Sequence, residues 1–132
     1  MKNKVEDILK ILELSERRIK HLHHIDNCNW YEWYKTYTKS ITEELVEVEA
    51  EIKENNSVYL EDELWDIFWT IICLINSLGE DNLIDKNKVF KRCFKKYSER
   101  LWNSPEFEAV NWDETKKKQK EELAKEHKIL HW

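Results

Sequence analysis

The stretch LEDELWDIFWTIICLINSLG, residues 60–79, decides the fold of this 132-residue chain. Its apolar side chains recur at the three- and four-residue steps of a helix, and its one glycine comes at the end. The whole chain holds only one glycine, Gly79, and one proline, Pro105. Because turns between strands draw on these two residue types, a sandwich, barrel or doubly wound sheet is strongly disfavoured. The sequence therefore predicts an all-α protein without a glycine-rich phosphate loop.

Clusters of turn-forming residues divide the chain into predicted helices. Asn29 is expected to cap the second helix, with Glu32 completing a capping box. Gly79 is expected to lie just beyond the third helix, in the position that glycine favours after a helix end. The first helix carries apolar residues at helical spacing from Val5 to Leu22. The next three predicted helices run approximately over residues 30–54, 58–78 and 85–102.

The end of the chain differs in character, because TKKKQKEELAKEHK, residues 115–128, is almost wholly polar. Residues 111–114 could cap a last helix there, but a helix that is polar all round rarely packs into a core. We therefore expect a four-helix-bundle-like domain over residues 1–104, with its core at 30–102. Residues 105–132 are predicted to form a polar helical appendage that is exposed or contacts a partner.

Charge and cysteine content argue against several classes of protein. The chain has 22 basic and 27 acidic residues and a formal net charge of −5, whereas a general nucleic-acid binder is more often basic. Its three cysteines have no C-x-x-C spacing, which disfavours a disulfide framework or a zinc site. The N-terminus lacks the apolar core of a signal peptide, and polar residues interrupt the longest apolar stretch, residues 64–78. We expect a cytoplasmic protein with no nucleic-acid or membrane partner.

Four acidic residues on the second and third predicted helices stand out by their spacing. Glu44 and Glu47 lie three positions apart, as do Glu63 and Asp66, so each pair shares one helix face. In an antiparallel hairpin that turns at Asn55, Glu47 should face Glu63. Glu44 should then face Asp66 at the same height, since both pairs are equally far from the turn.

Four converging carboxylates would repel one another and raise one another's pKa values. Asp66 also lies in the most apolar stretch of the chain, where an unpaired carboxylate is rare. Oxygen ligands of this kind favour a hard divalent cation, Mg²⁺ with Mn²⁺ as the alternative. A di-iron bundle is disfavoured, because no histidine follows a glutamate by three positions on either helix. A solvated acidic face is the alternative, and it is the interpretation for Glu49, Glu51, Glu54, Glu61 and Asp62.

The pattern Glu43-Glu44-x-x-Glu47, followed by Glu63-x-x-Asp66, resembles the E-E-x-x-E … E-x-x-D signature of MazG-type nucleotide pyrophosphohydrolases. The resemblance covers about residues 30–102 and implies the all-α MazG fold. It implies Mg²⁺-dependent hydrolysis of the α–β linkage of a nucleoside triphosphate to the monophosphate and pyrophosphate, by a homodimer or homotetramer. Glu43 or Glu47 would orient or deprotonate the attacking water. The implied metal ligands are Glu44, Glu47, Glu63 and Asp66.

Further residues are candidates for holding the substrate. The segment KYSER, residues 96–100, is similar to a K-[FY]-x-x-R segment of MazG proteins. Lys96 and Arg100 share one helix face and could grip phosphate oxygens, unless they are solvated or pair with the acidic second helix. Trp30, Trp33 and Tyr37 share a helical stripe that ends at the carboxylates, so a base could stack there. The alternative is that these three rings belong to the core.

Two other functions stay open. One is a non-catalytic helical interaction module on a MazG-like scaffold, although the intact set of four carboxylates argues against it. The other is a hydrolase resembling phosphoribosyl-ATP pyrophosphatases. The expected role is housekeeping of the nucleotide pool.

Overall fold

The computed structural model describes residues 2–25, 29–101 and 112–131, and within these ranges the chain forms five α-helices and no strand. They are α1 (Lys2–His23), α2 (Tyr34–Glu51), α3 (Ser57–Glu80), α4 (Lys86–Leu101) and α5 (Trp112–His131). The predicted all-α class is therefore confirmed. Asn111, the first residue of the predicted cap at residues 111–114, and the predicted domain boundary after residue 104 lie outside the described residues. None of the described helices is long and apolar enough to cross a membrane.

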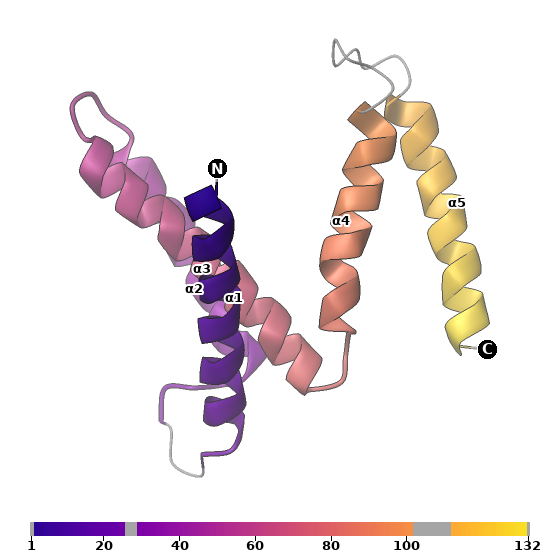
Figure 1. Cartoon of the computed structure of the whole chain (residues 1–132), viewed down its shortest axis with the longest axis horizontal. Coiled ribbons are helices and arrows are strands. Elements are labelled where there is room, and N and C mark those ends of the chain that lie inside the picture. Colours follow the sequence, from indigo (N-terminus) through magenta and orange to yellow (C-terminus); the bar gives the residue numbers. More distant parts are fainter. Residues whose placement is uncertain (1, 26–28, 102–111, 132) are drawn as a thin grey trace. The chain divides into compact units, whose positions relative to one another are not determined.

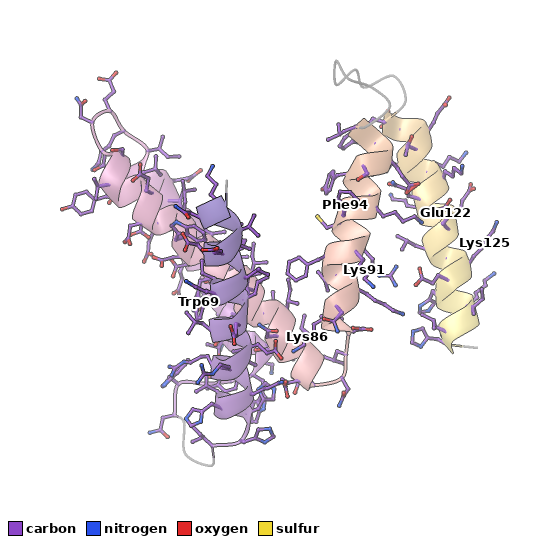
Figure 2. All side chains as sticks on the ribbon, in the orientation of Figure 1. Trp69, Lys86, Lys91, Phe94, Glu122 and Lys125 are labelled. Carbon is purple, nitrogen blue, oxygen red and sulfur yellow. The ribbon has the colours of Figure 1, made fainter. Side chains whose placement is uncertain are left out.

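Residues 1–86 and 87–132 form two compact units. In the first unit, α3 packs against both α2 and α1 (Figure 1). Only the second half of α1 reaches the core, since Val5 near its start is 57% exposed. Trp69 on α3 packs against the core while staying partly exposed (Figure 2). The buried core residues are Ile19, Leu22, Tyr31, Tyr37 and Cys73.

Polar side chains are buried beside this core. Asn76 Nδ2 on α3 donates to Ser15 Oγ on α1 at 2.9 Å. The Tyr31 hydroxyl lies 2.6 Å from His23 Nδ1 and 3.3 Å from Ser77 Oγ, which connects the segment before α2 to both neighbouring helices. Because buried polar groups are costly unless they are paired, these contacts favour one register of α1 on α3.

α2 begins at Tyr34, later than predicted, and the predicted capping box with Glu32 is wrong. The cap residue is Trp33, which has a φ of 56° and makes no side-chain cap hydrogen bond. Burial of Tyr31 gives the physical reason, because a side chain only 7% exposed gains more in the core than as a helical residue in solvent. The backbone N–H of Glu32 instead donates to Thr36 Oγ1 at 2.6 Å, which pairs a backbone donor just before the helix.

Gly79 lies inside α3, which continues to Glu80, so its predicted place beyond the helix is wrong. The left-handed residue after α3 is Asn82, with a φ of 58°, a conformation that asparagine tolerates. Gly79 instead provides space, because a Cβ added there would lie 3.3 Å from the Cβ of Lys86. Lys86 in turn pairs with Glu16 on α1 at 3.0 Å. The missing side chain at Gly79 thus allows Lys86 to lie close to α3 and to pair with α1.

In the second unit, α5 pairs with α4 through long polar side chains. Arg92 binds both carboxylate oxygens of Glu126, at 2.9 and 2.6 Å, and Lys95 binds Glu122 at 3.2 Å. No side chain of α4 is buried, and Phe94 is 70% exposed (Figure 2). The predicted polar C-terminal helix is therefore present, and it contacts α4 through ion pairs and hydrogen bonds rather than through a buried apolar core.

Candidate active site

The turn between α2 and α3 sets the register of the site. Only residues 52–56 separate the two packed helices, so they run antiparallel. Asn55 takes the left-handed conformation, with a φ of 56°. Asn56 Nδ2 donates to the backbone carbonyl of Glu51 at 2.8 Å and to its carboxylate at 2.6 Å. The turn is thus centred where the spacing of the acidic residues predicts it.

This register brings four carboxylates together across the helix pair. Glu44, Glu47, Glu63 and Asp66 each offer one oxygen, and these four oxygens lie within 4.8 Å of one another. Glu44 and Glu63 are half-buried, whereas Glu47 and Asp66 are exposed. The apolar stretch around Asp66 therefore does not bury that residue, and burial falls on one glutamate from each helix instead.

Burial and like charge act together on the half-buried carboxyls. The pKa of Glu44 is raised from 4.5 to about 7. Burial is the largest cause, followed by contact with the Glu47 carboxyl and by the charges of Glu47, Asp66 and Glu63. The pKa of Glu63 is also raised, by burial first and by the charge of Glu47 second. Ionising all four groups together is therefore unfavourable in the folded protein, and a positive charge among them would remove the conflict.

Two oxygen atoms of the cluster are buried without a partner. Oε2 of Glu44 and Oε2 of Glu63 have no hydrogen bond, although buried polar atoms are normally paired. The two atoms come from facing helices and from the same group of four carboxylates. Hard divalent cations such as Mg²⁺ and Mn²⁺ take carboxylate oxygens and leave positions for water and phosphate. The cluster is therefore consistent with divalent metal binding.

The structure does not bring the other predicted site residues in α2, or in the segment before it, into this cluster. Glu43 is exposed and lies outside the group of four. Tyr37 is 7% exposed and belongs to the core. Trp30 and Trp33 are 52% and 54% exposed, and their rings lie 6.1 and 6.3 Å from that of Tyr31. The predicted aromatic stripe is thus divided into one core ring and two exposed rings that lie before the helix.

Lys96 and Arg100 are half-buried in the last turns of α4, within the second unit. Arg100 Nε donates to Gln119 Oε1 on α5 at 2.9 Å. The Arg100 guanidinium also lies 4.9 Å from the centre of the Trp112 ring. The backbone carbonyl of Lys96 accepts from Gln119 Nε2 at 3.0 Å. The face that was predicted to hold phosphate is therefore in contact with α5.

Two residues with structural importance were missed in the sequence. Tyr31 lies between helices, where no periodic pattern marks a residue as buried. Gln119 stands in a lysine-rich run, yet it is 8% exposed. A weak signal for it existed, because Trp112, Gln119 and Leu123 form a stripe of uncharged residues at helical spacing along an otherwise charged helix.

The model of the MazG nucleotide pyrophosphohydrolase domain family matches residues 33–103, more than half of the chain. The match begins at the cap of α2 and includes α2, α3 and α4, and with them all four carboxylates. It leaves α1 and α5 outside. No curated protein and no solved structure matched the chain. The resemblance inferred from the spacing of the acidic residues is confirmed.

Proposed function

The chain belongs to the MazG nucleotide pyrophosphohydrolase domain family, and we propose on that basis that it hydrolyses nucleoside or deoxynucleoside triphosphates between the α and β phosphates. The products would be the nucleoside monophosphate and pyrophosphate, and the role would be housekeeping of the nucleotide pool. The observation that carries the proposal is the group of four carboxylate oxygens within 4.8 Å, two of whose residues hold a buried and unpaired oxygen. A solvated acidic face does not account for buried oxygens without partners.

The proposed metal ligands are Glu44, Glu47, Glu63 and Asp66, with Mg²⁺ as the cation and Mn²⁺ as the alternative. When bound, such a cation supplies charge neutralisation of the triphosphate and polarisation of the scissile P–O bond. The carboxylates would hold it between α2 and α3, and the half-buried pair, Glu44 and Glu63, would be ionised once their charge is matched.

The proposed reaction is direct attack by water on the α-phosphorus. A new P–O bond forms, the bond to the α–β bridging oxygen breaks, and pyrophosphate leaves with the bonding electrons. Glu47 or Glu43 would accept the proton of the water. The exposed position of Glu47 beside the other carboxylates supports the first choice, whereas Glu43 lies outside the group.

Lys96 and Arg100 are the proposed phosphate contacts, and Trp30, Trp33 and Tyr37 are the proposed base contacts. Trp33 precedes Glu44 by about 16 Å of helix rise, so a base stacked there requires an extended substrate. Tyr37 is nearer, at about 10 Å of rise from Glu44, but it is buried in the core.

A homodimer or homotetramer is the proposed assembly. Large apolar side chains are exposed at the end of the α2–α3 hairpin, where Ile52 is 63%, Val58 72% and Tyr59 66% exposed. Neighbouring apolar residues left in water favour association with a second copy.

The decisive experiment is product analysis on a panel of nucleoside triphosphates, with Mg²⁺, Mn²⁺ or a chelator. Release of pyrophosphate and monophosphate that depends on the cation, and that is lost in Glu47→Gln, is the expected result. Release of inorganic phosphate and a diphosphate would contradict α–β cleavage. No release from any triphosphate with either cation would favour the non-catalytic interaction module.

A further inference from the structure

Helix α5 lies outside the family match, yet its buried residue contacts the end of α4 at three points. Gln119 Oε1 accepts from Arg100 Nε at 2.9 Å. Gln119 Nε2 donates to the Lys96 carbonyl at 3.0 Å and lies 3.3 Å from Glu99 Oε1. One amide thus uses both its acceptor and its donors on a single turn of α4, which fixes the turn and the arginine together.

Aromatic rings complete the setting of Arg100. Its guanidinium carbon lies 4.9 Å from the centre of the Trp112 ring and 5.7 Å from that of Tyr97. A guanidinium near the faces of aromatic rings is attracted by their electron density and loses rotamer freedom. Arg100 is therefore oriented before any ligand arrives, by contacts from α5 and from its own helix.

We infer that Gln119 and Trp112 are positioning residues, and that α5 serves to preorganise Arg100 for binding the phosphate chain of the substrate. The inference rests on the proposed function for the identity of the ligand. Arginine has five N–H donors, and the bond to Gln119 uses the one on Nε. Phosphate oxygens are commonly bound in pairs by a guanidinium, so a fixed plane reduces the entropy that binding costs.

The rival explanation is that Gln119 only holds the two helices together. The pair has other contacts for that purpose, because Arg92 binds Glu126 and Lys95 binds Glu122 without involving Gln119. A leucine of similar size could fill the same buried position without polar partners. The three polar contacts of the amide instead converge on the turn that ends in Arg100.

The test is a double-mutant cycle on the full chain. Gln119→Leu is expected to raise KM for the triphosphate by about tenfold, as loss of a charge-assisted contact does, while kcat stays within about twofold. In the Arg100→Ala background the same change should leave KM unaltered, because the residue being positioned is gone. Glu122→Gln is the matched control, since it weakens an α4–α5 ion pair without touching Arg100, and its KM should stay at the wild-type value.

Several outcomes would overturn the inference and identify what failed. An equal rise in KM in both backgrounds would assign Gln119 to helix pairing alone. A raised KM in Arg100→Ala with a normal KM in Gln119→Leu would support Arg100 as a phosphate contact and refute Gln119 as its positioning residue. Wild-type kinetics in Arg100→Ala would refute both phosphate binding by Arg100 and its positioning by α5, whereas the proposed hydrolysis would be unaffected.

A binding measurement keeps the inference testable if no triphosphate is hydrolysed. Inorganic tripolyphosphate with Mg²⁺ can be titrated calorimetrically into the wild type, Gln119→Leu and Glu122→Gln. A Kd raised only in Gln119→Leu would support the positioning even where the proposed reaction has failed. Equal Kd values in the three proteins, or no binding to any of them, would overturn it. Circular dichroism on each variant establishes that its helices have formed.

Discussion

Replacing Glu47 with glutamine should stabilise the protein when no metal is bound, and it should abolish the Mg²⁺-dependent hydrolysis. Burial and the Glu47 carboxyl raise the pKa of Glu44 from 4.5 to about 7, and a shift of this size corresponds to about 3 kcal/mol of unfavourable ionisation. Burial is the largest cause and persists in the variant, so we expect removal of the Glu47 charge to recover about 1 kcal/mol. For a unit of this size, that is a rise in Tm of about 4–8 °C.

The size of the stabilisation depends on pH. The folded-state pKa of Glu44 lies above its unfolded value of 4.5, so its contribution is most favourable below pH 4.5 and is lost as the pH rises through about 7. Melting in a chelator should therefore separate Glu47→Gln from the wild type at pH 8 and bring the two curves together at pH 4. Adding Mg²⁺ should reverse the order at pH 8, because the wild type gains more from binding in its native state.

Glu49→Gln is the matched control, since Glu49 is exposed on the same helix and lies outside the cluster. Glu51 is less suitable than the sequence suggests, because its carboxylate accepts a hydrogen bond from Asn56. Asp66→Asn should repeat the result for Glu47 from the facing helix. A lower Tm for Glu47→Gln than for the wild type in chelator at pH 8 would refute the repulsion. Full Mg²⁺-dependent hydrolysis in Glu47→Gln and Asp66→Asn would refute the assignment of the site.

Three further predictions concern other parts of the chain. Arg100→Ala should raise KM or lower kcat, because it removes a charge-assisted contact worth roughly 1.5–3 kcal/mol, and it should leave the Mg²⁺-induced rise in Tm unchanged. Wild-type kinetics in both Arg100→Ala and Lys96→Ala would assign these two residues to the surface. Tyr31→Phe should lower the free energy of unfolding in urea by about 1–3 kcal/mol, since its hydroxyl contacts His23 and Ser77, and an unchanged value would show that the hydroxyl contributes nothing. Light scattering at micromolar concentration should give the mass of a dimer or tetramer, and a monomer would contradict the proposed assembly.

The carboxylate cluster could be predicted because its geometry is local. All four residues lie on two consecutive helices joined by a short turn, so the chain itself fixes which positions face each other. The spacing of Glu44 from Glu47 and of Glu63 from Asp66 then determines the rest. The spacing does not predict how deeply each carboxyl is buried, because burial depends on the side chains that surround the α2–α3 pair.

Residues between helices and between distant segments were predicted less well. Tyr31 enters the core from an irregular segment, and this long-range contact outweighed the capping signal of its neighbours. Gly79 has the residue type of a helix end, but the approach of Lys86 from beyond the turn explains its presence inside α3. Arg100 matched a family segment, whereas its contact with Gln119 spans nineteen positions and leaves only a faint stripe in the sequence.

A cation held by the four carboxylates would stabilise the first unit. Without a cation, ionisation of Glu44 near neutral pH costs the folded state at most about 3 kcal/mol. The buried polar contacts of Ser15 and Tyr31 involve none of the four carboxylates, so they do not depend on the cation. A ligand that binds the folded state at a hundredfold excess over its Kd returns about 2.7 kcal/mol. The two quantities are of the same size, so a divalent cation in the cluster would complete the site and offset its electrostatic cost together. The difference in Tm between Mg²⁺ and chelator therefore measures the site directly, and it should vanish in any variant that cannot hold the cation.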